Sequence, residues 1–290
     1  MIDLHTHTNH SDASISVPDL LKEAEAKKLL VLSITDHNTV TAYDELKDNE
    51  IRSLYQGKII KGIELTAIYQ GEIVEVLGYQ YNIDKIKPLL KKHYDSFEQE
   101  KINEFELIKD RFLSIGVKMN LNNIVFDPKI KSSRTAFLEE ISKYPENDKF
   151  FFDQKPSKNL ENFTRGEVFN PQSLLYVDFR SLYPSLEEAI NIIHEALGIA
   201  FLAHLFVYTK ATQNNLSKLI NDYKLDGLEC YHLRHNREQT EFLINYCDQN
   251  NLLKSGGSDY HKNNVSSDLG VGEGNLNIPE SLIINWKDRG

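Results

Sequence analysis

Asp3-Leu4-His5-Thr6-His7, with Ser11-Asp12 close behind it, is the most informative stretch of this chain. Its short apolar lead-in predicts a buried strand, and alternate side chains of a strand point to the same face. His5 and His7 should therefore project together, and Asp12 can join them from the loop that follows. Two imidazoles and a carboxylate are typical ligands of a divalent transition metal. A lone HxH pair would be weak evidence, because paired histidines often only satisfy local hydrogen bonds.

Residues of the same metal-binding types follow nearly every later strand that the sequence predicts. They are Asp36, His37, Glu64, His204, Asp259 and His261. In β/α barrels the carboxyl ends of the strands form the active face, so residues far apart in the sequence converge there. A single histidine after an apolar strand is more often a structural residue. The recurrence at so many strand ends favours a metal site over several unrelated structural uses.

Composition and charge restrict the class of protein. The 290 residues are enough to bury a full-size core. A net charge of −10 argues against a grip on long duplex nucleic acid, although a local basic pocket for a phosphate is compatible with it. Cys230 and Cys247 lack CxxC spacing and are typical of reduced thiols. With no signal sequence and no membrane-length apolar run, we expect a soluble, cytoplasmic protein without a membrane partner.

The order of the predicted elements divides the chain into two regions. Strands and helices alternate over 1–85 and again over 176–290, which predicts βα units with a largely parallel sheet. Within the first region the pattern predicts helices at 17–28 and 41–50, and strands at 29–34, 59–65 and 73–81. Residues 86–175 differ, because a charged stretch of helical period (86–115) precedes a Lys-, Asn-, Phe- and Pro-rich region. We predict an α/β fold with 86–175 inserted as a mostly helical cap.

Five segments carry a resemblance to a known family. They are DLHTHTNHSDA (3–13), ITDHNT (34–39), GIEL (62–65), FLAH (201–204) and GGSDYH (256–261). In these motifs the chain resembles the PHP (polymerase and histidinol phosphatase) family of metal-dependent phosphoesterases. The resemblance implies a distorted seven-stranded β/α barrel, formed here by 1–85 and 176–290, with two or three divalent ions at the strand ends. The opening and closing motifs look most like the branch that hydrolyses nucleotide and oligonucleotide phosphates.

The resemblance also implies a ligand set for each ion. One ion would be held by His5, His7, Glu64 and Asp259, and another by Asp12, His37 and His261. The ion between them would use Glu64 as a bridge, His204 and Glu75. Most relatives have His where this chain has Glu75, and a carboxylate there adds charge and favours Mn²⁺ over Zn²⁺. Fe is the third metal to be expected. Glu64, Asp259 and His204 are the residues expected to serve catalysis, although His204 or His261 could instead act as a general acid.

The substrate phosphate needs cationic partners, and guanidinium groups bind phosphate bidentately. The candidates in or beside the insertion are Lys131, Arg134, Arg165 and Arg180. For each of them a solvated surface charge is the simpler interpretation. His235 is a further candidate, because relatives of this branch often carry His there. Phe150 to Phe152 and Phe163 could stack on a base, but such groups more often pack a cap onto a barrel.

These expectations together predict a cytoplasmic enzyme that hydrolyses a phosphomonoester with water activated by clustered ions. The expected substrate is a nucleotide, a nucleoside 3′,5′-bisphosphate or a short oligonucleotide. A histidinol-phosphate phosphatase and a non-catalytic PHP scaffold are the alternatives. A barrel of the amidohydrolase kind also opens with HxH, but it usually needs a bridging Lys after a strand, and the sequence offers none at a strand end.

Overall fold

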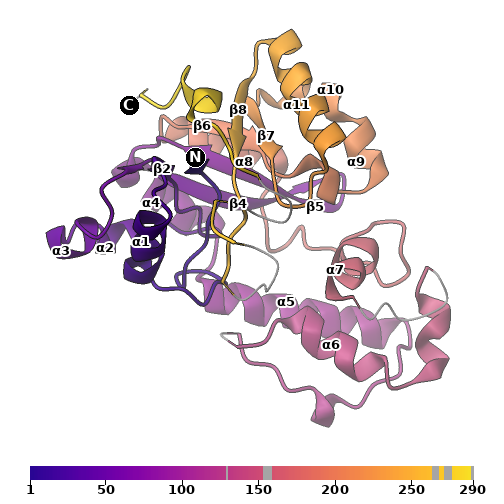
Figure 1. Cartoon of the computed structure of the whole chain (residues 1–290). Coiled ribbons are helices and arrows are strands. Elements are labelled where there is room, and N and C mark those ends of the chain that lie inside the picture. Colours follow the sequence, from indigo (N-terminus) through magenta and orange to yellow (C-terminus); the bar gives the residue numbers. More distant parts are fainter. Residues whose placement is uncertain (129, 153–158, 263–267, 271–275, 289–290) are drawn as a thin grey trace.

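The computed structural model describes residues 1–128, 130–152, 159–262, 268–270 and 276–288. Their strands form two sheets (Figure 1). The first is parallel, in the order β1 (Ile2–Asp3), β2 (Val31–Leu32), β3 (Lys58–Ile59). The second has the order β4 (Gly62–Tyr69), β5 (Glu72–Tyr79), β6 (Ile199–Leu202), β7 (Gly227–Tyr231), β8 (Leu253–Gly256).

The second sheet is mixed, so the expectation of a largely parallel sheet is corrected there. β4 and β5 form an antiparallel hairpin through Gln70 and Gly71, which both have positive φ values. β5 also runs antiparallel to β6, whereas β6, β7 and β8 are parallel. Apolar periodicity identifies strands but does not tell which edges pair. A mixed α/β fold is thus confirmed.

A seven-stranded barrel is not confirmed, because the described strands pair as three and five. Isolated bridges join the first sheet's strand-end loops to other parts of the chain, Thr6 with Tyr260 and His37 with Glu64. These bridges bring the ends of strands from both sheets to one place. The two sheets therefore bring the strand ends together, as was expected of one face of a barrel.

Two long predicted helical stretches are each divided by a capping residue. Residues 41–50 give α2 (Ala42–Glu45) and α3 (Asn49–Arg52), because Asp48 is extended and its side chain accepts from Glu50 N. The charged stretch gives α4 (Ile83–His93) and α5 (Phe97–Ser114), because Tyr94 is extended and Ser96 caps the second helix. The predicted helix at 17–28 is α1 (Val17–Ala26).

The C-terminal half supplies further helices around the five-stranded sheet (Figure 1). They are α8 (Leu186–Glu195), α9 (Lys210–Asn214), α10 (Leu216–Tyr223) and α11 (Arg237–Asn250). α8 packs on β4, β5 and β6, and α11 packs on β7 and β8. Every residue of β4 and β5 is buried as a result. None of the described helices is both long and apolar enough to cross a membrane.

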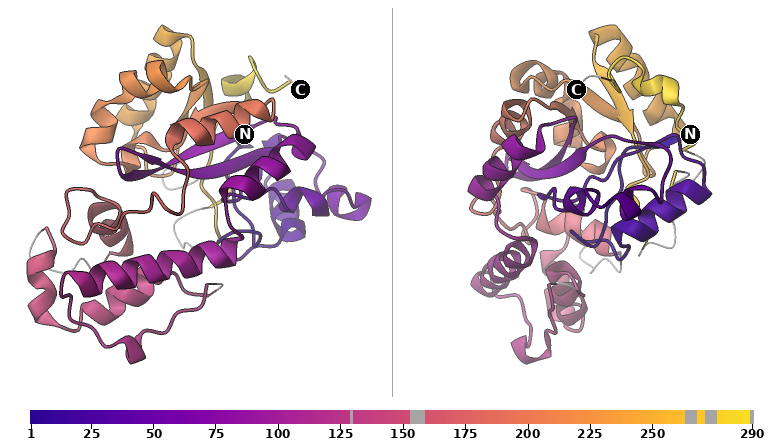
Figure 2. Two further views of the ribbon diagram at one scale, coloured as in Figure 1. Left: turned by 180° about the vertical axis from the view of Figure 1, so that it is seen from behind. Right: turned by 90° about the vertical axis from the view of Figure 1, so that its left-hand side faces the viewer.

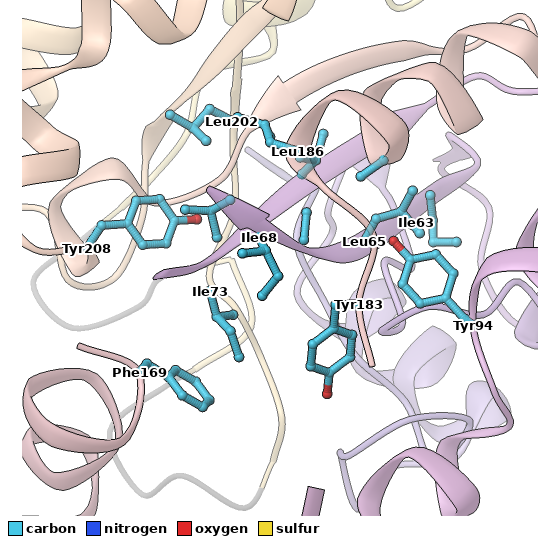
Figure 3. Close-up of a cluster of buried hydrophobic side chains, with 14 of the residues drawn as sticks. Ile63, Leu65, Ile68, Ile73, Tyr94, Phe169, Tyr183, Leu186, Leu202 and Tyr208 are labelled. Carbon is cyan, nitrogen blue, oxygen red and sulfur yellow. The ribbon is translucent and has the colours of Figure 1, made fainter. Parts of the chain in front are cut away.

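The inserted region is helical in its described parts. α5 lies beside α6 (Ser133–Ile141), below the sheets in every view, and α7 (Leu160–Phe163) lies nearer to β5 (Figures 1 and 2). Phe169 of this region belongs to the same buried cluster as Ile68 and Ile73 of the hairpin, and it lies beside Ile73 in Figure 3. Its role as a cap and its domain boundaries stay predictions.

The predicted aromatic group serves packing. Phe150, Phe151 and Phe163 are buried, and the rings of Phe151 and Phe163 lie 6.2 Å apart. Phe163 also meets Phe112 of α5 edge-on. Phe152 is 55% exposed, and none of the four lines the cavity described below. The packing alternative therefore describes this group better than stacking on a base.

Candidate metal centre and active site

Glu64 is the hub of a cluster that the strand ends build. Its Oε2 atom lies 3.2 Å from His5 Nε2, 3.3 Å from His7 Nε2 and 3.3 Å from His37 Nδ1. Its Oε1 atom lies 3.1 Å from His204 Nε2. Glu64 is the third residue of the long strand β4, not the end of a strand as predicted, because the hairpin extends to Tyr69. The bridge to His37 still places its carboxylate at the strand ends.

All nine predicted ligands come together. Four groups of ligand-type atoms each lie within 4.8 Å of one another: His7 with Asp12, His37 and His261; His5 with His7 and Glu64; His5 with His232 and Asp259; Glu64 with Glu75 and His204. Ligand bonds near 2 Å put neighbouring ligand atoms about 3 Å apart, which is the spacing seen around Glu64. The groups correspond closely to the ligand sets that the resemblance implies, and each residue's role as a ligand stays a prediction.

The donor atoms also have the character of a metal site. Buried ring nitrogens that face the cluster without a well-aligned hydrogen bond occur on four histidines, namely His5, His7, His37 and His232. Unpaired buried nitrogens are costly unless they bind something. A mixed set of imidazole nitrogens and carboxylate oxygens suits Mn²⁺, Fe²⁺ and Zn²⁺. The residues therefore fit the ions that the sequence predicts.

Charges inside the cluster are strongly coupled. Burial alone would lower the pKa of His7, but Asp259 and Glu64 outweigh it and raise that pKa to about 10. Burial would raise the pKa of Glu64, yet His5 and His37 hold it well below its usual range. Without metal the cluster thus keeps protons on imidazoles beside ionised carboxylates.

Metal binding should therefore release protons. His7 with a pKa of about 10 is protonated at neutral pH, and an imidazole must lose that proton to bind a metal. Metal affinity should rise with pH between about 6 and 9, because the falling proton concentration favours release of the displaced proton. Titration calorimetry of the metal-free protein in buffers of different ionisation enthalpy measures the number released. Zero protons released at pH 7 would contradict this assignment.

Two residues that the sequence reasoning missed belong to the site. Glu229 accepts a 2.8 Å hydrogen bond from His5 Nδ1 through one oxygen and one from the His204 backbone N through the other. It thereby fixes which nitrogen of His5 faces Glu64. His232 directly follows β7, and its Nε2 lies 3.4 Å from Asp259 Oδ2. The strand-end rule used elsewhere would have found His232.

Buried carboxylates also anchor the loops that carry the ligands. Asp3 accepts hydrogen bonds from Ser258 and Gly270 and so ties the Asp259 loop to β1. Asp36 accepts from Thr8 and Ser11 and so fixes the loop of Asp12. These contacts explain why acidic residues sit beside the ligands in the opening motifs.

The cluster forms one wall of a cavity of about 630 Å³. Four basic side chains line the same cavity: Lys101, Arg134, Arg165 and Arg234. Arg134 and Arg165 were predicted to lie near the substrate, whereas Lys101 and Arg234 were missed. Lys101 is on α5, where helical period alone does not distinguish a cavity-facing lysine from a solvated one.

Three other predicted phosphate partners do not line this cavity. Lys131 pairs with Glu139, and exposed Arg180 pairs with Asp178. His235 is buried, its Nδ1 lies 3.2 Å from the carbonyl of Cys230, and burial lowers its pKa to about 3. Sequence position within an insertion does not reveal which side faces the site. For these three residues, the role in phosphate binding stays a prediction that the geometry does not support.

Comparison with known proteins places the chain in a family. A model of the PHP domain matches residues 3–264. The chain belongs to the PHP-domain family. A 5′-3′ exoribonuclease from Haemophilus influenzae is similar at 27% identity, with 98% of this chain and 97% of the relative covered. A 3′,5′-nucleoside bisphosphate phosphatase from Chromobacterium violaceum is 23% identical, with 90% of this chain and 87% of the relative covered.

The fold of this PHP domain also has solved counterparts. A protein from Bifidobacterium adolescentis, described as a metal-dependent phosphoesterase, has a TM-score of 0.65 at 22% identity. The match covers 97% of this chain and 93% of that one. The predicted membership of a family of metal-dependent hydrolases is thus confirmed. The identity and number of the ions stay predictions.

Proposed function

We propose that this PHP domain hydrolyses a phosphate ester of a nucleotide, a nucleoside 3′,5′-bisphosphate or a short oligonucleotide, using two or three divalent ions. One observation carries the proposal. A cavity of about 630 Å³ is lined both by the histidine- and carboxylate-rich cluster and by a basic wall, formed by Lys101, Arg134, Arg165 and Arg234. That volume suits a small ligand. The relatives named as an exoribonuclease and a nucleoside bisphosphate phosphatase support a nucleotide-type substrate.

The acidic wall supplies the chemistry of bond cleavage. Divalent ions held by His5, His7, Glu64 and the neighbouring ligands would activate water and offset charge on the leaving oxygen. Glu229 orients His5, and Glu64 faces four imidazoles at once. The protein's own contribution is therefore a fixed, buried set of donors that needs little rearrangement.

The basic wall would bind the phosphate groups of the substrate. Arg134 Nη1 lies 2.9 Å from Glu104 Oε1, and Lys101 Nζ lies 3.6 Å from Glu104 Oε2. Glu104 is buried and holds both cations in place. Four cationic side chains are more than one phosphate requires, which supports a substrate with a second phosphate or a phosphodiester.

The same wall argues against the alternatives. Histidinol phosphate carries a single phosphate and would use fewer of these basic side chains. A scaffold without catalysis would have no use for so many buried imidazole and carboxylate groups, whose burial costs free energy. Stepwise 5′ to 3′ removal of nucleotides from RNA is the second candidate, because the relative from Haemophilus influenzae carries that name over 97% of its length.

A substrate screen tests the proposal. The protein is loaded with Mn²⁺, Fe²⁺ or Zn²⁺ and offered a nucleoside 3′,5′-bisphosphate, a nucleoside 5′-monophosphate, a 5′-phosphorylated tetraribonucleotide and histidinol phosphate. Release of inorganic phosphate from the bisphosphate is the expected result, and release of mononucleotides from the tetramer would favour the second candidate. Turnover of none of the nucleotide substrates with any metal would overturn the proposal.

Arg134 and Arg180 provide a matched pair of variants. Arg134→Gln should raise KM about 10- to 100-fold, because a hydrogen bond to a charged group contributes about 1.5–3 kcal/mol. Arg180→Gln removes the same charge outside the cavity and should leave KM unchanged. Steady-state kinetics with the best substrate of the screen measures both. Equal KM values for the two variants would show that the basic wall does not bind substrate.

A further inference from the structure

One carboxylate oxygen of the cluster has two partners of different kinds. Glu75 Oε2 lies 3.3 Å from His204 Nε2, within the group that Glu64, Glu75 and His204 form. The same oxygen lies 2.6 Å from Arg165 Nη2. A metal ion at this group and the guanidinium would therefore use the same atom. The other carboxylate of the group, Glu64, is shared with three more histidines.

Arg165 is firmly placed beside that oxygen. It belongs to a π-helical turn, Thr164–Val168, in the inserted region. Its Nη1 donates to the carbonyl of Ile73 at 3.3 Å. Its guanidinium carbon lies 5.5 Å from the centre of the Phe169 ring and 5.7 Å from that of Tyr208. Figure 3 shows the Phe169 ring beside Ile73. Arg165 still lines the cavity, with its side chain 19% exposed, so a ligand can reach it.

The two partners of Glu75 Oε2, the guanidinium and the metal ion, are both positively charged. A divalent ion bonded to Glu75 Oε2 would lie about 2 Å from that oxygen. The guanidinium nitrogen of Arg165 is hydrogen-bonded to the same oxygen. Two cations this close repel each other, and the protein around them screens that repulsion less than bulk water does. Glu75 carries one negative charge between them, and the charge of Glu64 is shared with the other imidazoles of the cluster. A divalent ion at this group should therefore bind with less favourable free energy than its three ligands alone would provide.

We infer that Arg165 competes with the divalent ion of the Glu64, Glu75 and His204 group, and that a substrate phosphate relieves the competition by taking Arg165 as its own partner. This ion is consequently the weakest of the cluster in the free protein and binds tightly only together with phosphate. The coupling is reciprocal, so the ion strengthens phosphate binding by the same factor. This regulation rests on the proposed function, in that phosphate is the ligand of Arg165.

Manganese binding measures the competition directly. The full-length protein is stripped with a chelator, and Mn²⁺ binding is followed by equilibrium dialysis with and without inorganic phosphate. In the wild type, phosphate should tighten the last ion about 10-fold, within the usual range of coupling between sites. Arg165→Gln should bind that ion about 10-fold more tightly without phosphate and lose the phosphate effect. Arg165→Met, which keeps the aliphatic stem against Phe169 and Tyr208, repeats the test if the first variant does not fold.

Two control variants make the result specific. Arg180→Gln, which removes a cation outside the cavity, should bind Mn²⁺ as the wild type does. Glu75→Gln should bind one ion fewer whether or not phosphate is present. An unchanged wild-type isotherm with phosphate, or an Arg165→Gln variant that binds the last ion no more tightly than the wild type, would overturn the inference.

The inference and the proposed function fail separately. If the wild type hydrolyses nucleotide phosphates but shows no coupling between phosphate and the last ion, only the competition is wrong. If no phosphate ester is hydrolysed but Arg165→Gln still tightens the last ion, the competition stands and the substrate class is wrong. The dialysis involves no turnover, which keeps the two outcomes apart.

Discussion

Glu64→Gln should reduce phosphoesterase turnover roughly a thousand-fold or more while the fold is retained. The carboxylate faces four imidazole nitrogens between 3.1 and 3.3 Å away, and every ion bound among them would depend on its charge. Metal ions contribute several kcal/mol to stabilising charge in hydrolysis, and each 1.36 kcal/mol corresponds to a factor of ten in rate. Phosphate release by the purified variant, with its circular dichroism spectrum beside that of the wild type, is the measurement.

A second buried carboxylate of the same hairpin provides the control. Glu72 accepts hydrogen bonds from Thr209 and Thr212 and lines no part of the cavity. Glu72→Gln should therefore keep turnover close to that of the wild type. If Glu64→Gln is as active as Glu72→Gln, the cluster is not the catalytic centre; a wild type that turns over no phosphate ester would instead favour the scaffold alternative.

Removal of metal should lower the melting temperature by on the order of 10 °C. A ligand that binds only the folded state at 100 times its Kd stabilises it by about 2.7 kcal/mol, so two ions would contribute roughly 5 kcal/mol. In a chain of this size each kcal/mol shifts the melting temperature by about 2 °C or slightly more. Scanning calorimetry before and after chelation measures the shift.

Glu64→Gln again sharpens this test, because that variant should have lost most of its bound metal already. Chelation should therefore shift its melting temperature much less than that of the wild type. A large shift in the variant would place the stabilising metal elsewhere in the molecule.

The ligand cluster was accessible from sequence because each of its parts is local. His5 and His7 alternate directly after the short strand β1, His37 and His204 each follow an apolar run, and Asp259 follows β8. Convergence of strand ends then needs only the general geometry of α/β folds. His232 satisfies the same rule after β7 and was overlooked in favour of His235, which points back to the carbonyl of Cys230.

Other features depend on tertiary contacts that no local pattern contains. The hairpin of β4 and β5 makes the larger sheet mixed. The sequence between these strands indicates a turn, but it does not indicate that β5 pairs with β6 on its other edge. Lys101 and Arg165 enter the cavity through the packing of the inserted helices. Helical period marks Lys101 only as polar, and the ionic pair of Arg165 with Glu75 spans 90 positions in the chain.

Anomalous diffraction from a crystal of the manganese-loaded protein would locate the bound ions. We expect at least two anomalous peaks inside the cluster around Glu64, each about 2.0–2.3 Å from nitrogen or oxygen atoms of the predicted ligands. Peaks confined to other parts of the surface, or a manganese-loaded crystal in which these side chains are dispersed and bind nothing, would contradict this expectation.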